Sequence, residues 1–306
     1  MKISKKQRKK LIRYALIILA ALVCFLVNLF GEWDKIGEQL GFSEPAVTAE
    51  GELEVHFIDV GNADCILVRQ GDKTMLIDAG ERSSKSTLQH YLDTYKVTKF
   101  DLVIATHPHA DHIGGMAYIL ENYPVDRFVM SYMDDAHTPT TASYENMLEA
   151  LLDKDIPVDE ATPGAVYELG TARLQILAPY EAGDEANNVS IVTRLTFGKK
   201  AFLFTGDAEK SVEKQMLSGE YPVDADVLKL GHHGSNTSNS TAFLRRVDPE
   251  FAVITCGEDN DYGHPHQEVM ERLDRQKVTV YRADVDGHIV FTTDGETLSV
   301  ATRKED

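Results

Sequence analysis

Three histidines and an aspartate lie within six residues, between His107 and His112. Residues 101–105, Asp-Leu-Val-Ile-Ala, precede them as a short apolar run with β-branched residues, which predicts a buried strand. Side chains that follow such a strand lie at its carboxyl end, where α/β proteins bind ligands. Gly114 and Gly115 come next and allow the backbone to turn closely. Because imidazole and carboxylate bind Zn²⁺ and related divalent ions, the stretch predicts a metal site at a strand end.

The block His107-x-His109-x-Asp111-His112 divides into an alternating pair and an adjacent pair. The two pairs point to two metal positions, one supplied by His107 and His109 and the other by Asp111 and His112. A histidine-rich surface loop is the alternative, and the buried strand in front of the block argues against it.

Two later segments repeat this plan. Residues 202–205 form an apolar strand that leads through a glycine to Asp207, and residues 227–230 lead through a glycine to His232 and His233. A carboxylate at such a place can bridge two metals, although an isolated Gly-Asp pair is a common turn. Paired histidines are more specific, and their alternative is a solvated turn. Both segments are candidates for further ligands.

A third histidine segment opens a predicted helix at residues 262–266, Tyr-Gly-His-Pro-His. Pro265 suits the first turn of that helix. We expect His264 to reach the metals as an acid or as a contact to the substrate, and His266 to be an exposed residue at the helix start.

Strands and helices alternate in two successive sets, which predicts an α/β protein with two β-rich layers covered outside by helices. One domain of about 250 residues is the simplest division. Predicted strands lie at residues 54–60, 65–69, 74–77, 101–105, 127–130, 166–169, 171–178, 189–196, 201–205, 227–230, 278–281 and 289–292. Predicted helices lie at residues 85–95, 116–122, 141–154, 208–217 and 267–276.

The N-terminus has the pattern of a membrane anchor. Residues 1–10 are strongly basic, and residues 11–30 are apolar over 20 positions, the length that crosses a bilayer. We predict a cytoplasmic tail, an uncleaved transmembrane signal anchor, a linker at residues 31–51 and a folded domain at residues 52–306, outside the membrane. A cleaved signal peptide and a buried soluble helix are the alternatives.

The charge of the remaining chain limits its partners. Of the 31 Lys and Arg residues, seven lie in residues 1–30, whereas all 49 Asp and Glu residues follow them, so residues 31–306 carry a net charge of −25. Such a body repels polyanions at long range and lacks the basic surface of a general nucleic-acid binder. Nucleic acid as a partner is therefore not supported by charge, and only a local basic groove would allow it.

The three cysteines exclude a disulfide-based scaffold. Cys65 and Cys256 fall in predicted strands and are expected as small buried apolar residues, with a single bridge between them as the alternative.

Together, these segments resemble the metallo-β-lactamase fold superfamily. The resemblance rests on His107, His109, Asp111, His112, Asp207 and one of His232 and His233, together with residues 57–64 and 76–80. The segments at 187–190, 228–235 and 263–266 resemble the hydrolase domain of ComEC-type competence DNA-uptake proteins and their free-standing relatives. The resemblance implies a four-layer αββα sandwich of two mixed β-sheets.

The resemblance also implies a binuclear site for two divalent ions, Zn or Mn, in which Asp207 bridges the ions. Hydroxide activated by the two metals would attack the substrate. Asp111 would bind one metal and orient that hydroxide, and His264 would protonate the leaving oxygen or hold a phosphate. Asn188 and Ser235 are candidate contacts to the substrate or to the ligands. Asp59, Asp64 and Asp78 would orient ligands and loops.

Two departures from the family pattern matter. Asn188 stands where many members place a third histidine, so the His107/His109 site is expected to be the weaker one. The channel helices of the DNA-uptake proteins are absent, so DNA transport by this chain alone is unsupported.

We therefore predict a membrane-anchored extracellular hydrolase of phosphodiester bonds, acting on a phosphate-containing substrate that is small or polymeric. Hydrolysis of another ester, a lactone or an amide is the first alternative, and a binding protein of low activity is the second. The sequence carries no signal for an oligomeric state.

Overall fold

The computed structural model describes residues 51–133, 138–180 and 186–304. All of them belong to the second of two units into which the chain divides, Val47–Asp306. The predicted tail and anchor lie outside the described residues, as does the linker except for its last residue. Among the residues that the structure describes, no helix combines the length and the apolar character needed to cross a membrane.

The first sheet contains eight strands and is mixed. Its order is β15 (Leu298–Arg303), β14 (His288–Thr293), β1 (Leu53–Phe57), β2 (Ile66–Gln70), β3 (Lys73–Ile77), β4 (Leu102–Ala105), β5 (Phe128–Met130) and β6 (Val158–Glu160). Neighbouring strands run antiparallel from β15 to β3 and parallel from β3 to β6. The parallel part holds the predicted strand before the histidine block, and its four residues are all buried.

The second sheet contains seven strands and is also mixed. Its order is β13 (Thr279–Arg282), β12 (Phe251–Ile254), β11 (Val227–Lys229), β10 (Lys200–Phe204), β9 (Val192–Phe197), β8 (Ala172–Ala178) and β7 (Val166–Leu169). The strands from β13 to β10 are parallel, and those from β10 to β7 are antiparallel.

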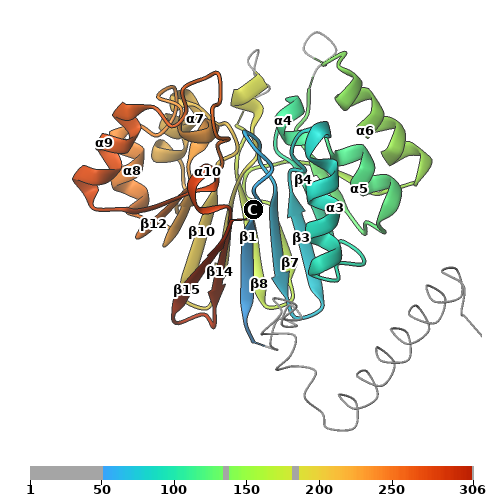
Figure 1. Cartoon of the computed structure of the whole chain (residues 1–306), viewed down its shortest axis with the longest axis horizontal. Coiled ribbons are helices and arrows are strands. Elements are labelled where there is room, and N and C mark those ends of the chain that lie inside the picture. Colours follow the sequence, from blue (N-terminus) through green and yellow to red (C-terminus); the bar gives the residue numbers. More distant parts are fainter. Residues whose placement is uncertain (1–50, 134–137, 181–185, 305–306) are drawn as a thin grey trace, which may run out of the picture. The chain divides into compact units, whose positions relative to one another are not determined.

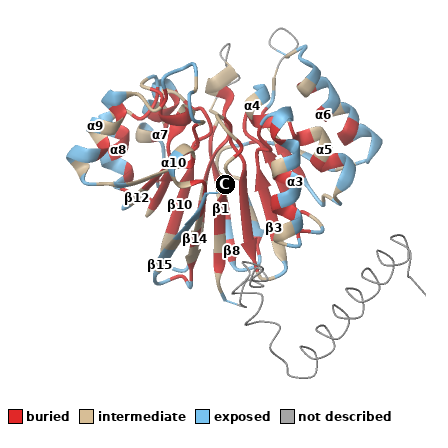
Figure 2. Ribbon diagram, viewed as in Figure 1, coloured by how far each residue is buried: buried red, intermediate tan, exposed pale blue. Residues whose placement is uncertain are grey.

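The two sheets pack face to face between two layers of helices, which confirms the predicted α/β architecture (Figure 1). Phe57, Phe204 and Phe291 meet in the core between the sheets, with Phe57 lying 6.1 Å from each of the other two ring centroids. Burial of each ring contributes about 2–3 kcal/mol to folding. Figure 2 shows the strands as the most buried part and the outer helix faces as exposed.

Helices cover each sheet from outside. The apolar sides of α3 (Lys85–Thr94), α5 (Met116–Asn122) and α6 (Ala142–Asp153) pack on the first sheet. Those of α7 (Lys210–Ser218), α8 (Thr241–Val247) and α9 (Gln267–Gln276) pack on the second. Two short helices, α4 (Ala110–Ile113) and α10 (Ala283–Asp286), lie in loops.

Some elements differ from the sequence prediction. The strand predicted from residue 189 begins at Val192, because Ala186–Val189 forms a short 3-10 helix, η2, in which Ser190 N–H donates to Asn187 O. The strand β6 was not predicted, because it has three residues at a sheet edge and no buried side chain to produce an apolar pattern.

Candidate metal centre

The histidine block lies where β4 ends and runs into α4. His109 is the residue before the first turn of α4, and Asp111 and His112 lie within it. The turn packs tightly on the loop after β3, because a Cβ atom at Gly115 would lie 2.3 Å from the carbonyl oxygen of Ala79. Close packing of this kind fixes the ligand side chains without a metal.

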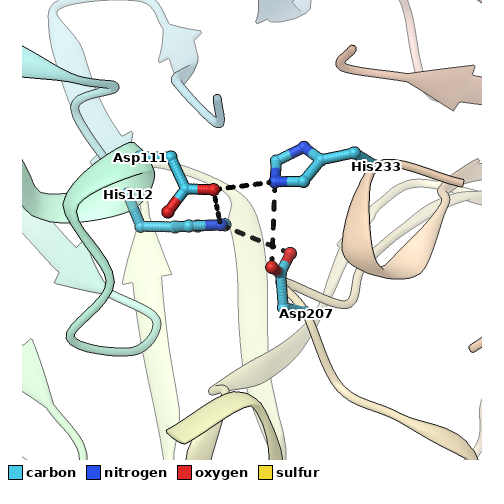
Figure 3. A group of neighbouring side chains, drawn as sticks. All are labelled: Asp111, His112, Asp207 and His233. Atoms are coloured by element: carbon cyan, nitrogen blue, oxygen red, sulfur yellow. Dashed lines mark hydrogen bonds and ion pairs between the residues drawn. The ribbon is translucent and has the colours of Figure 1, made fainter. Parts of the chain in front are cut away.

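Four side chains from three loops form the first ligand group, which consists of Asp111, His112, Asp207 and His233. Figure 3 shows that their contacts close a ring around a common centre. His112 Nε2 lies 3.3 Å from Asp207 Oδ1 and 3.8 Å from Asp111 Oδ2. His233 Nε2 lies 3.2 Å from Asp111 Oδ2 and 3.7 Å from Asp207 Oδ2.

These separations fit a divalent metal. Ligand atoms at bond lengths of about 2.0–2.2 Å in a tetrahedron stand about 3.3–3.6 Å apart, and the four distances of 3.2–3.8 Å bracket that range. His112 Nε2 and Asp207 Oδ1 are also buried and have no hydrogen-bond partner among the described residues. Buried polar atoms are normally paired, so two unpaired atoms that face each other at this distance suit a shared cation.

A second ligand group shares the same carboxylate. It consists of His107, His109 and Asp207. His107 Nε2 lies 3.7 Å from Asp207 Oδ2 and 3.1 Å from His109 Nδ1. Asp207 therefore stands between the two groups, as the bridging prediction requires.

The structure separates the roles of the paired histidines. Both have left-handed backbones, with φ of 52° at His232 and 51° at His233. His233 is buried, its Nδ1–H donates to Thr255 O at 2.7 Å, and its Nε2 faces the first ligand group. His232 Nε2 reaches only Asp207 Oδ2, at 3.8 Å, and lies outside both groups.

Asp78, which we predict to orient ligands, contacts His112. Its Oδ2 accepts a hydrogen bond from His112 Nδ1–H at 2.7 Å, which holds the ring so that Nε2 faces the first ligand group. Asp78 also accepts from the backbone N–H and the hydroxyl of Thr106, at 2.8 and 2.6 Å. The Thr106 hydroxyl in turn lies 3.2 Å from His107 Nδ1, so one carboxylate orients both ligand groups.

Sequence reasoning missed several contacts around the site. Ser190 Oγ accepts the backbone N–H of Asp207 at 3.1 Å and fixes the bridging residue. Thr255 Oγ1 donates to Asp64 Oδ1, and Lys229 forms a buried ion pair with Asp64 Oδ2. A lysine inside the apolar run 227–230 was the available signal, because lysine is almost never fully buried unless it is paired.

The remaining predicted residues lie around the ligand groups. The amide oxygen of Asn188 accepts from Ser211 Oγ at 3.0 Å, whereas the neighbouring Asn187 Oδ1 is buried and has no hydrogen-bond partner among the described residues. Ser235 Oγ lies 3.1 Å from Thr237 Oγ1, which lies 3.1 Å from His232 Nδ1. Through this chain, Ser235 supports His232.

Asp59 and His264 complete the predicted set. Asp59 closes a local turn by accepting the N–H of Gly61 at 3.2 Å and belongs to neither ligand group. The His264 ring lies 5.5 Å from the His232 ring and 6.4 Å from the His233 ring. Burial, followed by the neighbouring His232 and His233, lowers the pKa of His264 to about 4, so its ring is neutral near pH 7.

Opposite charges set the titration of the first ligand group. Burial acts to lower the pKa of His112, but the carboxylates of Asp207 and Asp78 outweigh it and hold this pKa well above its usual value. Burial acts to raise the pKa of Asp207, yet the imidazoles of His112 and His233 bring it well below the usual range. A metal ion therefore competes with protons at these imidazoles.

Cys65 and Cys256 are buried and do not form a disulfide bond, which agrees with the expectation that they are small buried apolar residues.

Comparison with known proteins matches most of this domain to one family. A family model described as the metallo-beta-lactamase superfamily matches residues 58–258. ComE operon protein 3 of Bacillus subtilis is 31% identical over 272 residues, which make up 82% of this chain and 34% of that protein. Recombination protein 2 of Haemophilus influenzae is 28% identical over 291 residues, 93% of this chain and 32% of that protein. The chain thus spans about a third of the length of these two relatives.

Two further matches are more distant. Endoribonuclease ysh-1 of Neurospora crassa is 22% identical over 211 residues, which are 61% of this chain and 24% of that protein. Among solved structures, the metallo-beta-lactamase fold protein YhfI of Bacillus subtilis superposes with a TM-score of 0.54 and 14% identity, covering 79% of this chain and 100% of YhfI. At that identity the superposition shows the fold alone.

Proposed function

This chain belongs to the metallo-β-lactamase superfamily of metal-dependent hydrolases, and from that premise we propose that it hydrolyses phosphodiester bonds. The observation that carries the proposal is the buried Asp207 carboxylate between two ligand groups, with Oδ1 facing His112 and Oδ2 facing His107. Paired sites on one carboxylate suit displacement at phosphorus, in which charge builds on the attacking and the leaving oxygen. The endoribonuclease relative, which is named for cleavage of such bonds, supports this bond class.

Each of the two ligand groups would hold one metal ion. His112, His233 and Asp111 would hold one ion together with Asp207, and His107 and His109 would share Asp207 with the other. When bound, such ions supply Lewis acidity and make a water molecule acidic enough to lose a proton near neutral pH. Imidazole and carboxylate ligands of this kind suit Zn²⁺ and Mn²⁺.

The protein's own groups then position the reactants. The first ligand group contains Asp111, whose pKa lies well below its usual range because the hydrogen bond from His233 and the charge of His112 outweigh burial. As an ionised carboxylate at the site, Asp111 can accept a hydrogen bond from the attacking water and orient it. His264 is neutral near pH 7, which favours a role as a hydrogen-bond contact to a phosphoryl oxygen over a role as the acid.

The charge of the chain favours a small or tethered substrate. Residues 31–306 carry −25, and long free DNA would meet this field before it reached the site. The relatives named for competence and recombination support nucleic acid as a further substrate class to include in an assay.

The direct test is a substrate panel with the purified full-length chain. Bis-p-nitrophenyl phosphate, DNA, phosphorylcholine esters and nitrocefin are assayed with Zn²⁺ and with Mn²⁺, beside Asp111→Ala. We expect cleavage of the phosphodiester substrates and its loss in the variant. Cleavage of an ester or lactam with no phosphodiesterase activity under either metal would refute the proposal.

We place this activity outside the membrane, anchored by residues 11–30 as the basic and apolar pattern predicts. Mass spectrometry of the cell-associated protein should then find the N-terminus intact. A mature protein that begins after Ala49 would overturn the anchor.

A further inference from the structure

A buried cation lies close to the candidate metal centre. Lys229 is the last residue of the inner strand β11 and is fully buried. Its Nζ forms an ion pair with Asp64 Oδ2 and donates to the carbonyl oxygen of Gly206 at 3.2 Å. These two contact residues lie on separate loops, Asp64 on a loop of the first sheet and Gly206 on a loop of the second.

Both contacts lead to metal ligands. Gly206, with a left-handed φ of 50°, is the residue immediately before Asp207, so a hold on its carbonyl group limits where the bridging carboxylate can lie. Asp64 Oδ1 lies 3.5 Å from His233 Nδ1, and Asp64 Oδ2 lies 3.8 Å from His112 Nδ1. Lys229 thus supports the first ligand group through two routes, one through Asp64 and one through Gly206.

The same neighbourhood contains a third cluster of ligand-type side chains. Asp64, Asp78 and His112 are all buried, and their ligand atoms lie within 4.8 Å of one another. By composition, this cluster resembles a third metal site. The ammonium group of Lys229 already faces Asp64 there, however, and His112 Nδ1–H already faces Asp78 at 2.7 Å. Buried carboxylates need a paired charge, and here the protein supplies both partners itself.

We propose that Lys229 is a positioning residue of the metal centre: it takes the place of a third cation and fixes Asp64 and Gly206, and through them His233 and Asp207. The inference rests on the metal centre of the proposed function but not on the bond that is cleaved. It predicts that the chain holds two metal ions and that the first ligand group depends on a side chain that touches neither ion.

The test is metal binding by the full-length chain and by Lys229→Met, which keeps the length of the side chain and removes its charge. Lys200→Met is the matched control, because Lys200 forms the same kind of ion pair, with Asp226 at 3.0 Å, at the opposite end of the neighbouring strand β10. Affinity is measured by competition with a chelator, metal content by elemental analysis, and ligand geometry by the visible spectrum of the Co²⁺-loaded protein.

We expect Lys229→Met to bind its more tightly held ion about ten- to a hundredfold more weakly, the usual loss when a support of a ligand is removed. Its Co²⁺ spectrum should change, whereas Lys200→Met should match the parent chain in both measurements. If Lys229→Met keeps the affinity and the spectrum and loses only thermal stability, Lys229 is merely structural and the proposal fails.

A milder variant keeps the test decisive if Lys229→Met does not fold. Thr255→Val removes the hydroxyl that donates to Asp64 Oδ1 and retains the shape of the side chain. It should weaken metal binding in the same direction by a smaller factor, and unchanged binding would count against the role of Asp64. Because none of these measurements uses a substrate, failure of the proposed phosphodiesterase activity would leave this result untouched.

Discussion

Replacement of Asp78 by asparagine tests how the metal centre is oriented. The residue has a left-handed φ of 58°, which asparagine adopts readily, so the backbone should persist. The asparagine Oδ1 can still accept the Thr106 N–H that lies 2.8 Å from the native carboxylate. Its amide nitrogen then replaces Oδ2, which accepts from His112 Nδ1–H at 2.7 Å. Two N–H donors cannot face each other at this distance.

The conflict is relieved if the His112 proton moves from Nδ1 to Nε2. That shift is harmless to the fold, but it places a hydrogen on the nitrogen that must bind the metal. Metal binding through Nε2 then breaks the hydrogen bond between the asparagine amide and His112 Nδ1 and leaves two buried donors facing each other, and a buried donor without a partner costs about 1–3 kcal/mol. We therefore expect Asp78→Asn to weaken metal binding by about ten- to a hundredfold, while the metal-free protein loses little stability.

Competition between the protein and a fluorescent chelator for Zn²⁺ measures this change. Asp101→Asn is the control, because Asp101 also accepts a backbone N–H, from Thr74 at 3.0 Å, but lies at the start of β4, away from the site. Equal affinities in Asp78→Asn and the parent chain would show that the His112 tautomer does not limit binding, and the orientation argument would be wrong.

Four further outcomes are expected. His233→Gln should reduce metal content more than His232→Gln, because only His233 faces Asp111 and Asp207 together; equal losses by elemental analysis would contradict this assignment. Zn²⁺ affinity should fall as the pH is lowered toward and below 7. The raised pKa of His112 lets protons compete with the metal up to a higher pH than at a free histidine, and an affinity that does not change with pH would refute this prediction. Gly115→Ala should destabilise the protein by about 1–3 kcal/mol in urea unfolding, since the new Cβ would lie 2.3 Å from Ala79 O, and a silent variant would show that the turn can move. Removal of metal by a chelator should lower the melting temperature, because free metal at a hundred times its dissociation constant contributes about 2.7 kcal/mol; an unchanged midpoint would speak against bound metal.

Sequence reasoning located the ligand groups because strand ends carry local signals. The apolar run at residues 101–105 and the histidines behind it sit where a parallel strand of the first sheet ends. Asp207 follows β10 and His233 follows β11, which are parallel neighbours in the second sheet. Carboxyl ends of neighbouring parallel strands share one edge, so Asp207 and His233 lie close together. Their meeting with the histidine block, which follows a strand of the other sheet, was expected from the family resemblance.

The supporting contacts were beyond such reasoning because they cross between elements. The pairing of Lys229 with Asp64 joins strand ends of the two sheets, and no periodicity in either segment reports it. The choice between His232 and His233 depends on two consecutive left-handed residues, a geometry that the sequence leaves open. Likewise, only the packing of η2 shows that Ser190 holds Asp207.

The two sheets supply different parts of one ligand set. Loops of the first sheet carry Asp111 and His112, and loops of the second carry Asp207 and His233. A metal ion held by all four would therefore link the two sheets directly, in addition to the apolar core and the ion pair of Lys229 with Asp64. Any motion that parts the sheets at this edge would release the ion, and loss of the ion would loosen the edge. The rate of metal exchange would then measure how often the two sheets separate at this edge. Slow exchange would indicate that the sheets rarely separate there.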